Sequence, residues 1–454
     1  MARMAPNPLE AFQWTPQPKA AAPLRRLVDQ LLDADPVATG LARRMKDETG
    51  TRFIDWIDHL VLSPDHRAMS ELAAAGYVRE TAQDGTPHFV QPHGMFPPIV
   101  PGARLSAALK VESVADFAAA NGLALTSCDP PLSPLRRLAI SDALSVVERH
   151  GFRGYSPPTH SALRGENFLR HLEKLRTRRP NFQNDDLGFE HVHQLLDSAI
   201  ADLGVDAACD LFFQAEREFW QRRNRAAQAQ KSRQDKLGLG WANHDHHTYR
   251  SSRENFPKLV AVFEILGFKC RERFYAGREA GWGAQVMEQS IAGIITFNDV
   301  DLTPDELTQD FAHQPLAVRP TLGTVGLWCA LHGDSFLEAG MHHLEAQFDF
   351  DALRQQLEAE QGVKTMKPFT DLPYLRQAFT EGERWKVAEK RIARVLTAGQ
   401  ITPAQAEQFR HEGAIGSHLE NLERNDGFKG FNQSGVSQII SATDPRKHLH
   451  RAGA

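Results

Sequence analysis

Cysteine is scarce in this chain of 454 residues. There are four, Cys128, Cys209, Cys270 and Cys329, and no two of them have CxxC spacing. Their scatter argues against a zinc ribbon or a redox dithiol and fits a reducing compartment. The sequence also lacks any run of eighteen apolar residues, and its beginning lacks the apolar core of a signal peptide. We therefore expect a cytoplasmic protein that neither crosses nor binds a membrane.

A strong net charge is also missing. The formal net charge is -5, the isoelectric point is near 6.5, and 41% of the residues are hydrophobic. This composition predicts a folded protein of two or three domains, without the basic field that binds nucleic acid. The motifs GxGxxG, Walker A, GxSxG and HExxH are absent too, so nucleotide-dependent, serine-hydrolase and zincin activities have no support. Nothing in the sequence predicts the oligomeric state.

Two distant segments share one order of features. "IDHLVLSPDHRAMSELAAAGYV" and "HDHHTYRSSRENFPKLVAVFEILGFK" each place Asp-His on an expected strand, followed by an amphipathic helix, a glycine, an aromatic residue and a new strand. In the second segment, Pro257 fits the first helical turn if Asn255 is the N-cap. Similar units usually pack side by side, so residues far apart in the sequence can converge.

The expected fold class is α+β. Tandem βαβββ units should form a curved mixed sheet around a metal site, with a large helical insertion and a C-terminal helical cap. The expected segments are an N-terminal arm and helix (1–48), a first βαβββ-like unit (49–135), a helical insertion (136–237), a second βαβββ-like unit (238–330) and a helical cap segment (331–454).

The expected chemistry is that of two imidazoles and one carboxylate on one face of a metal, the facial triad of non-haem iron(II) oxygenases. His59 and His246 come from the first strands of the two units. Glu112 in "ALKVES" is the expected carboxylate, because alternation along the strand separates it from Leu109. Glu288 in "QVMEQ" is the rival carboxylate, and His244, on the strand face of His246, is an alternative ligand.

Other polar residues have weaker or different expected roles. Arg250 follows His246 by four residues, which returns it to the same strand face, where a guanidinium suits a substrate carboxylate. "GFNQSG", with Gln433 and Ser434, is either a substrate clamp or a plain turn. The pairs "MHHLE" and "HVH" are interpreted as structural.

These motifs together resemble the 2-oxoadipate dioxygenase/decarboxylase (hydroxyglutarate synthase) family of the vicinal-oxygen-chelate superfamily. "HHTYRSS" is similar to that family's His-x-x-x-Arg metal motif, "IDHLVLS" to its second metal-histidine strand, "ALKVES" to its glutamate strand and "GFKGFNQSG" to a substrate-side segment. The likeness covers about half of the chain. The order differs, because in that family the His-x-x-x-Arg unit comes first.

The resemblance implies an Fe(II) enzyme that uses O2 to convert a 2-oxo acid to a shortened hydroxy acid and CO2. The implied reaction, a step of lysine catabolism, converts 2-oxoadipate to 2-hydroxyglutarate. His59, His246 and Glu112 would then hold iron, with Arg250, Gln433 and Ser434 on the substrate and Arg250 in the catalytic role. Two alternatives remain open: a Zn²⁺- or Ni²⁺-dependent glyoxalase-like isomerase or lyase, and a non-catalytic small-molecule-binding protein of the same fold.

Overall fold

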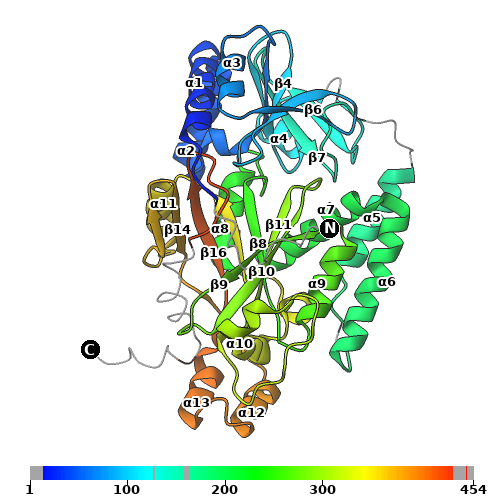
Figure 1. Cartoon of the computed structure of the whole chain (residues 1–454), viewed down its shortest axis with the longest axis vertical. Helices are drawn as coiled ribbons and strands as arrows, with labels where there is room; N and C mark the ends of the chain where they lie inside the picture. The colour runs from blue at the N-terminus through cyan, green and yellow to red at the C-terminus, as the bar shows by residue number, and fades with distance from the viewer. Residues whose placement is uncertain (1–13, 126–127, 158–162, 181, 433–445, 447–454) are drawn as a thin grey trace, which may run out of the picture.

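The computed structural model describes residues 14–125, 128–157, 163–180, 182–432 and 446. Two β-sheets dominate it, a smaller one at the top of Figure 1 and a larger one below, with helices beside and beneath the larger sheet. Among the helices of these residues, none combines the length and the apolarity that a membrane span requires.

A pair of helices lies in the N-terminal segment, where one helix was expected. The pair comprises α1 (Pro18–Ala34) and α2 (Pro36–Thr49). Asp35 separates the two helices and caps α2, because its side chain accepts hydrogen bonds from the N–H groups of Val37 and Ala38 at 2.8 and 3.2 Å. Pro36 occupies the first turn of α2, where proline costs no hydrogen bond.

The smaller sheet has seven strands in the order β2-β3-β4-β1-β5-β7-β6. Its strands are β1 (Ile57–Leu62), β2 (Val78–Thr81), β3 (Pro87–Val90), β4 (Ile99–Pro101), β5 (Ser106–Lys110), β6 (Leu135–Ala139) and β7 (Leu144–Arg149), and its helices are α3 (Ala68–Ala74) and α4 (Val114–Ala120). β1 pairs in parallel with β4, β5 pairs in parallel with β7, and β1 and β5 join them antiparallel. The sheet thus consists of one βαβββ unit and one shorter βαββ unit.

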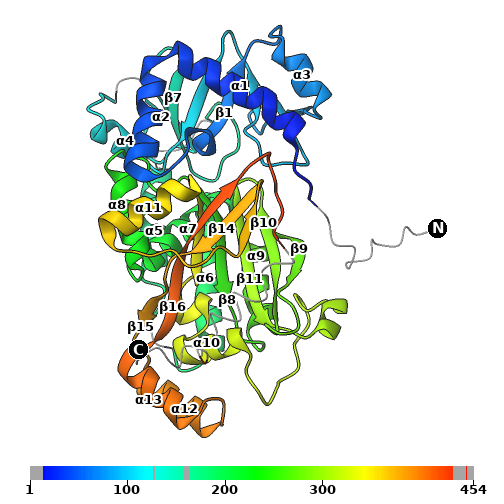
Figure 2. The ribbon, with the colours of Figure 1, turned by 90° about the vertical axis from the view of Figure 1, so that its left-hand side faces the viewer.

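The larger sheet has nine strands, eight of them in the order β13-β14-β16-β12-β8-β11-β10-β9, with β15 pairing to β16. Its strands are β8 (His244–Arg250), β9 (Lys269–Tyr275), β10 (Trp282–Gln289), β11 (Ile294–Asp301), β12 (His343–Gln347), β13 (Thr370–Leu372), β14 (Leu375–Phe379), β15 (Glu383–Trp385) and β16 (Ala414–Arg424). Figure 2 shows these strands as a sheet beneath the N-terminal helices.

Two complete βαβββ units make up this sheet. The first is β8, α9 (Phe256–Ile265), β9, β10 and β11, and the second is β12, α11 (Phe350–Gln361), β13, β14 and β16. In each unit the first strand pairs in parallel with the last, and the first strands β8 and β12 join the units antiparallel. This duplication is the vicinal-oxygen-chelate, glyoxalase-like fold, so the expected fold class is confirmed.

Three details of the expected organisation are wrong. The segment 136–149 forms strands β6 and β7 rather than helix. The segment after residue 331 supplies β12 to β16 in addition to the helices α12 (Glu389–Thr397) and α13 (Pro403–Glu412). The two similar segments also do not share a sheet, because each pairs with the unit that directly follows it along the chain. Asn255 does precede α9, and Pro257 lies in its first turn, as expected.

Helices cover one face of the nine-stranded sheet, here called the helix face. They are α5 (Leu163–Arg176), α6 (Asp185–Leu203), α7 (Val205–Gln221) and α8 (Arg225–Asp235), together with α9. Phe213 of α7, Phe263 of α9 and Tyr249 of β8 meet in the largest apolar core. The opposite face, here called the cavity face, carries a separate cluster of aromatic side chains.

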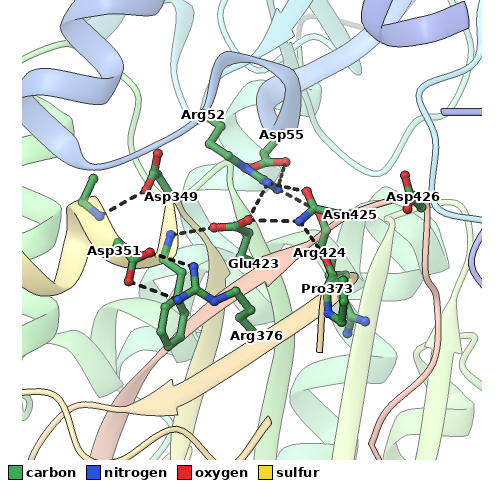
Figure 3. A network of polar contacts seen from close by, with 12 residues as sticks. Arg52, Asp55, Asp349, Asp351, Pro373, Arg376, Glu423, Arg424, Asn425 and Asp426 are labelled. Atoms are coloured by element: carbon green, nitrogen blue, oxygen red, sulfur yellow. Dashed lines mark hydrogen bonds and ion pairs between the residues drawn. The ribbon is translucent and has the colours of Figure 1, made fainter. Parts of the chain in front are cut away.

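A polar joint connects the two sheets where the chain enters β1 (Figure 3). Arg52 forms a two-pronged ion pair with Asp55, at 2.7 Å for each contact. The same guanidinium donates to the side chain of Asn425 at 2.7 Å and lies 3.3 Å from Glu423 at the end of β16. Its planar fork can satisfy several acceptors at once, so one side chain fixes the N-terminal sheet against the larger one.

Candidate metal centre

His59 lies on β1 of the smaller sheet, and both of its ring nitrogens have partners. Nδ1 is 2.6 Å from a carboxylate oxygen of Asp58, and Nε2 is 3.2 Å from a guanidinium nitrogen of Arg137. Because a guanidinium only donates hydrogen bonds, Nε2 accepts from Arg137 and Nδ1 carries the proton that it donates to Asp58. Burial lowers the pKa of His59, which favours the neutral ring. The lone pair on Nε2 of His59 is therefore directed at Arg137.

Glu112 holds the turn that leads into β8. Its carboxylate accepts a hydrogen bond from the backbone N–H of Trp241 at 3.2 Å and pairs with the ammonium group of Lys231 at 3.2 Å. Gly240 allows this close approach: its φ is +65°, and an added Cβ would lie 2.3 Å from the carboxylate of Glu112. The arrangement gives Glu112 a local structural role.

The three expected ligands therefore do not converge. His59 belongs to the seven-stranded sheet and His246 to the nine-stranded sheet, whereas Glu112 faces Lys231. Among the described residues, the His, Cys, Asp and Glu groups whose donor atoms lie within 4.8 Å of one another include His246 but neither His59 nor Glu112.

The alternative ligands also have other partners or positions. Glu288 pairs with Arg271 at 3.3 Å and with Lys429 at 3.4 Å. His244 lies against His247, with ring centroids 5.1 Å apart, and it belongs to none of the donor groups described above.

His246 has the geometry of a ligand. Its Nδ1 lies 2.7 Å from a carboxylate oxygen of Asp245 and is hydrogen-bonded to Glu345, whereas its Nε2 is buried without a hydrogen-bond partner. Burial opposes the charged ring, but the negative charges of Asp245 and Glu345 outweigh it and raise the pKa of His246. A carboxylate that accepts the Nδ1 proton fixes the tautomer in which Nε2 offers its lone pair, as is usual for histidines that bind metals.

Two identical tripeptides lie side by side next to His246. His343-Leu344-Glu345 of β12 pairs in register with His418-Leu419-Glu420 of β16. Aligned residues of paired strands point to the same face, and the alternating pattern turns the histidines and glutamates away from the two leucines. Leu344 and Leu419 are buried in the core of the helix face, so the four polar side chains lie on the cavity face.

His343 connects the two glutamates. Its Nε2 lies 3.3 Å from Glu420 and 3.6 Å from Glu345, and its Nδ1 lies 2.8 Å from Nδ1 of His342. The other oxygen of Glu420 accepts a hydrogen bond from Gln377 of β14 at 3.0 Å. His246, His343, Glu345 and Glu420, here called the cavity-face cluster, thus bring two imidazoles and two carboxylates together.

The charges of this cluster fit a cation. Burial and the negative charge of Glu345 raise the pKa of Glu420 well above its ordinary range. Burial also opposes ionisation of Glu345, but His246 and His343 outweigh it and lower the pKa of that carboxyl. Two buried carboxylates repel each other unless a proton or a cation lies between them. The unpartnered Nε2 of His246 and this pair of carboxylates together satisfy the requirements of a divalent metal.

Sequence reasoning missed His343, Glu345 and Glu420. It interpreted "MHHLE" as structural in a helical or loop context, although "HLE" recurs in "GSHLENL". The recurrence of a short His-x-Glu alternation in two segments was the available signal, because period-two spacing places both polar residues on one strand face. Only the register of β12 and β16 shows that the two segments are neighbours.

A small cavity of about 50 Å³ adjoins the cluster. Glu345, Glu420 and His343 form its polar end. Its other lining residues are Phe274, Trp282, Phe297, Asp299, Phe369, Gln377, Phe379, Phe431 and Asn432. The ring of Phe431 also lies 4.7 Å from the ring of His246, centroid to centroid. This mostly aromatic lining lowers the local dielectric constant, which strengthens electrostatic interactions at the polar end.

Arg250 lies behind the cavity wall. It is buried, its Nε is 3.6 Å from Asp299, and its guanidinium lies 5.7 Å from the ring centre of Trp328. Asp299 lines the cavity, so the guanidinium of Arg250 lies next to a carboxyl group of the cavity wall. Gln433 and Ser434 lie outside the described residues, although their neighbours Phe431 and Asn432 line the cavity.

Asp299 makes stability depend on pH. Burial raises its pKa to about 8, although Arg250 opposes the shift. The folded protein therefore keeps a proton that the unfolded chain releases near pH 4, so stability should fall as the pH rises from about 4 to 8. In metal-free protein, Asp299→Asn should match the wild-type melting temperature near pH 4 and exceed it increasingly up to about pH 8. The exposed Asp371, replaced in the same way, should show no such trend; a parallel trend in both variants would contradict this assignment.

Comparisons with known proteins find similarity in structure alone. No family model and no curated protein sequence matches the chain. A putative glyoxalase superfamily protein from Ralstonia eutropha JMP134 aligns over 59% of this chain and 97% of its own, with 11% identity and a TM-score of 0.32. A mutant of 4-hydroxymandelate synthase from Streptomyces coelicolor aligns over 86% and 98%, with 12% identity and a TM-score of 0.29.

Methylmalonyl-CoA epimerase from Mycobacterium tuberculosis aligns over 40% of this chain and 89% of its own, with 12% identity and a TM-score of 0.23. At such scores these likenesses carry no argument about function.

Proposed function

We propose that the protein is an Fe(II)-dependent dioxygenase that decarboxylates a 2-oxo acid, with His246, His343 and Glu420 as the iron ligands. The observation that carries the proposal is a pair of buried donor groups that share Glu345, namely Asp245-His246-Glu345 and His343-Glu345-Glu420, of which the second lies at the polar end of an aromatic cavity. Two histidines and one carboxylate are the donor set of the facial triad. Iron bound there would supply open coordination positions at which a 2-oxo acid and dioxygen can react.

The neighbouring residues of the chain would prepare these ligands. Glu345 accepts the hydrogen bond of His246 Nδ1 and so orients the ring. Gln377 holds one oxygen of Glu420, which leaves the other oxygen on the side of His343. Hydrogen bonds of this kind fix the orientation of metal ligands before the metal binds.

The first substrate candidate is 2-oxoadipate. It is supported by the resemblance of the His246-x-x-x-Arg250 motif to the hydroxyglutarate synthase family. In the proposed complex, the far carboxylate of the substrate takes the place next to Arg250 that Asp299 occupies. Because Asp299 has a raised pKa, it is largely protonated at neutral pH and leaves much of the charge of Arg250 available.

A second candidate is a 2-oxo acid with an aromatic or bulky apolar side chain. The lining of the cavity favours it, since six aromatic rings, including those of Phe274, Trp282 and Phe297, surround the space next to the cluster. Aromatic rings pack favourably edge-to-face or offset against one another. The present volume of about 50 Å³ is small, so such a substrate requires the rings to move apart.

The test is anaerobic reconstitution with Fe(II), followed by oxygen uptake with a panel of 2-oxo acids. We expect one iron per chain, and oxygen consumption matched by CO2 release with at least one panel member. Preference for 2-oxoadipate over phenylpyruvate would select the first substrate, and the reverse order would select the second.

Two other outcomes would contradict the proposal. Stoichiometric binding of Zn²⁺ or Ni²⁺ with turnover of a glyoxalase-type substrate and no oxygen consumption would indicate an isomerase or lyase. Failure to retain any of these metals would indicate a non-catalytic binding protein.

Replacing Arg250 separates substrate binding from metal binding. In Arg250→Ala we expect KM for the accepted 2-oxo acid to rise about 10- to 100-fold, because a charge-assisted contact contributes roughly 1.5–3 kcal/mol, while iron content is unchanged. Arg253→Ala is the control, since Arg253 pairs with Glu306 outside the cavity. Loss of iron in the Arg250 variant, or an equal change in the Arg253 variant, would contradict the assigned role.

A further inference from the structure

Three side chains that can bind a metal meet at one edge of the nine-stranded sheet. They are Glu264 of α9, Cys270 of β9 and His313 of the loop between β11 and α10 (Thr324–His332). One donor atom from each residue lies within 4.8 Å of the donor atoms of the other two. The three residues, here called the edge cluster, are exposed, so a cation can reach them from solvent.

A shift in strand pairing directs Cys270 towards α9. β9 is the outermost strand of the sheet (Figure 2), and its register against β10 shifts between Val286 and Met287. Cys270 therefore pairs with Met287, whose side chain belongs to the core of the helix face. Aligned residues of paired strands point to the same face. The thiol thus lies on the side of α9 and Glu264, opposite to the cavity-face cluster.

The loop that carries His313 is fixed to the sheet. Phe311, two residues earlier, is 1% exposed and packs in the core of the helix face. Arg273 of β9 donates to the backbone carbonyl groups of Leu307 and Gln309 at 3.1 and 2.7 Å. These contacts hold the imidazole near the other two donors before a metal binds, which lowers the entropic cost of binding.

Asp310 orients the imidazole of His313. Its carboxylate lies 2.8 Å from Nδ1, which directs Nε2 towards Glu264, 2.9 Å away. A carboxylate on the second ring nitrogen is the usual arrangement for a histidine that binds a metal. Arg273 lies 3.3 Å from Asp310, so this guanidinium pairs with the orienting carboxylate.

We propose that Glu264, Cys270 and His313 bind a zinc ion at this edge of the sheet. Thiolate, imidazole and carboxylate are all zinc ligands, and the soft thiolate selects zinc over Mg²⁺ or Ca²⁺. Tetrahedral zinc with bonds of about 2.0–2.3 Å places its ligand atoms about 3.3–3.8 Å apart, a spacing that small side-chain rotations would produce here.

Binding would release protons and connect three parts of one βαβββ unit. The thiol of Cys270 and Nε2 of His313 each give up a proton to solvent when they bind the ion. A water molecule supplies the fourth ligand. The ion then joins α9, β9 and the loop after β11, on the opposite side of the sheet from the proposed iron site.

The test is Co²⁺ binding to the full-length protein under anaerobic conditions. Co²⁺ can replace Zn²⁺ in such sites, and a thiolate ligand gives it an intense near-ultraviolet charge-transfer absorption. We expect one equivalent of Co²⁺ to produce this absorption and one equivalent of Zn²⁺ to abolish it. Co²⁺ at the cavity-face cluster would not produce it, because that cluster contains no cysteine. Failure to observe the absorption would overturn the proposal.

Variants locate the ion. Cys270→Ser should abolish the charge-transfer absorption, and His313→Ala should lower the affinity for Co²⁺ at least about 10-fold. Cys128→Ser is the matched control, because Cys128 is a partly exposed cysteine outside the edge cluster, and it should preserve the absorption. His343→Ala should preserve it too, so the result is independent of the proposed iron site. An absorption that survives in Cys270→Ser, or an unchanged affinity in His313→Ala, would overturn the proposal.

Discussion

Replacement of His343 by alanine should abolish iron binding and oxygen-dependent turnover. The imidazole of His343 lies 3.3 Å from Glu420 and 3.6 Å from Glu345, and without it one of the two neutral donors of the proposed triad is lost. Disturbing residues that merely support a metal ligand typically costs 10- to 100-fold in affinity, so loss of a ligand should lower iron affinity by at least about 100-fold. Iron content after anaerobic reconstitution and desalting, measured by a colorimetric chelator, is the readout.

His59→Ala is the matched comparison, because it tests the ligand that the sequence favoured. In the structure, Asp58 and Arg137 occupy both ring nitrogens of His59, so this variant should keep its full iron content. If His59→Ala loses iron while His343→Ala retains it, the ligand set expected from the sequence is correct and the cavity-face cluster is not the iron site. Circular dichroism of both variants controls for misfolding.

The sequence predicts the fold class because the relevant signals are local. Alternating strands, an amphipathic helix and a closing glycine recur within about thirty residues around His59 and again around His246. Local sequence signals do not determine which two units pair with each other in a sheet. β8 and β12 are separated by some ninety residues in the chain, and nothing in either strand specifies that they pair with each other rather than with β1.

The incorrect prediction of a helix over residues 136–149 has a physical cause. The segment "ALSVVER" becomes β7, where Leu144 and Val146 enter the core beneath α4 and Val147 packs on the opposite face. A strand that is buried on both faces loses its period of two, and short apolar runs then fit a helix equally well. The adjacent β-branched pair Val146-Val147 was the residue-level signal for a strand.

The order of the motifs has a simple explanation in the structure. The His246-x-x-x-Arg250 strand begins the nine-stranded sheet, and the other proposed ligands, His343 and Glu420, follow it on β12 and β16. The proposed site therefore has its His-x-x-x-Arg unit first, as in the family that the sequence resembles. The reversed order depends on His59, which lies in the preceding sheet, and on Glu112, which follows the strand β5 of that sheet.

Removing the carboxylate of Glu216, which lies outside the proposed site, should cause a large loss of stability. Its carboxylate is 1% exposed and binds Arg178 at 2.9 Å, Arg179 at 2.6 Å and the hydroxyl of Tyr249 at 3.1 Å. Glu216→Ala leaves two arginines without a counter-ion, and breaking a buried pair in this way costs about 3–5 kcal/mol.

The matched control is a carboxylate two residues further along α7. Glu218 pairs with Arg176 at 2.6 Å, but both side chains are partly exposed, at 30% and 42%. Exposed pairs of this kind contribute about 0–1 kcal/mol. Urea unfolding followed by tryptophan fluorescence should therefore give a much lower midpoint for Glu216→Ala than for Glu218→Ala. Equal midpoints would mean that Arg178 and Arg179 find other partners or water, and that the helical block is not fixed to β8 through this carboxylate.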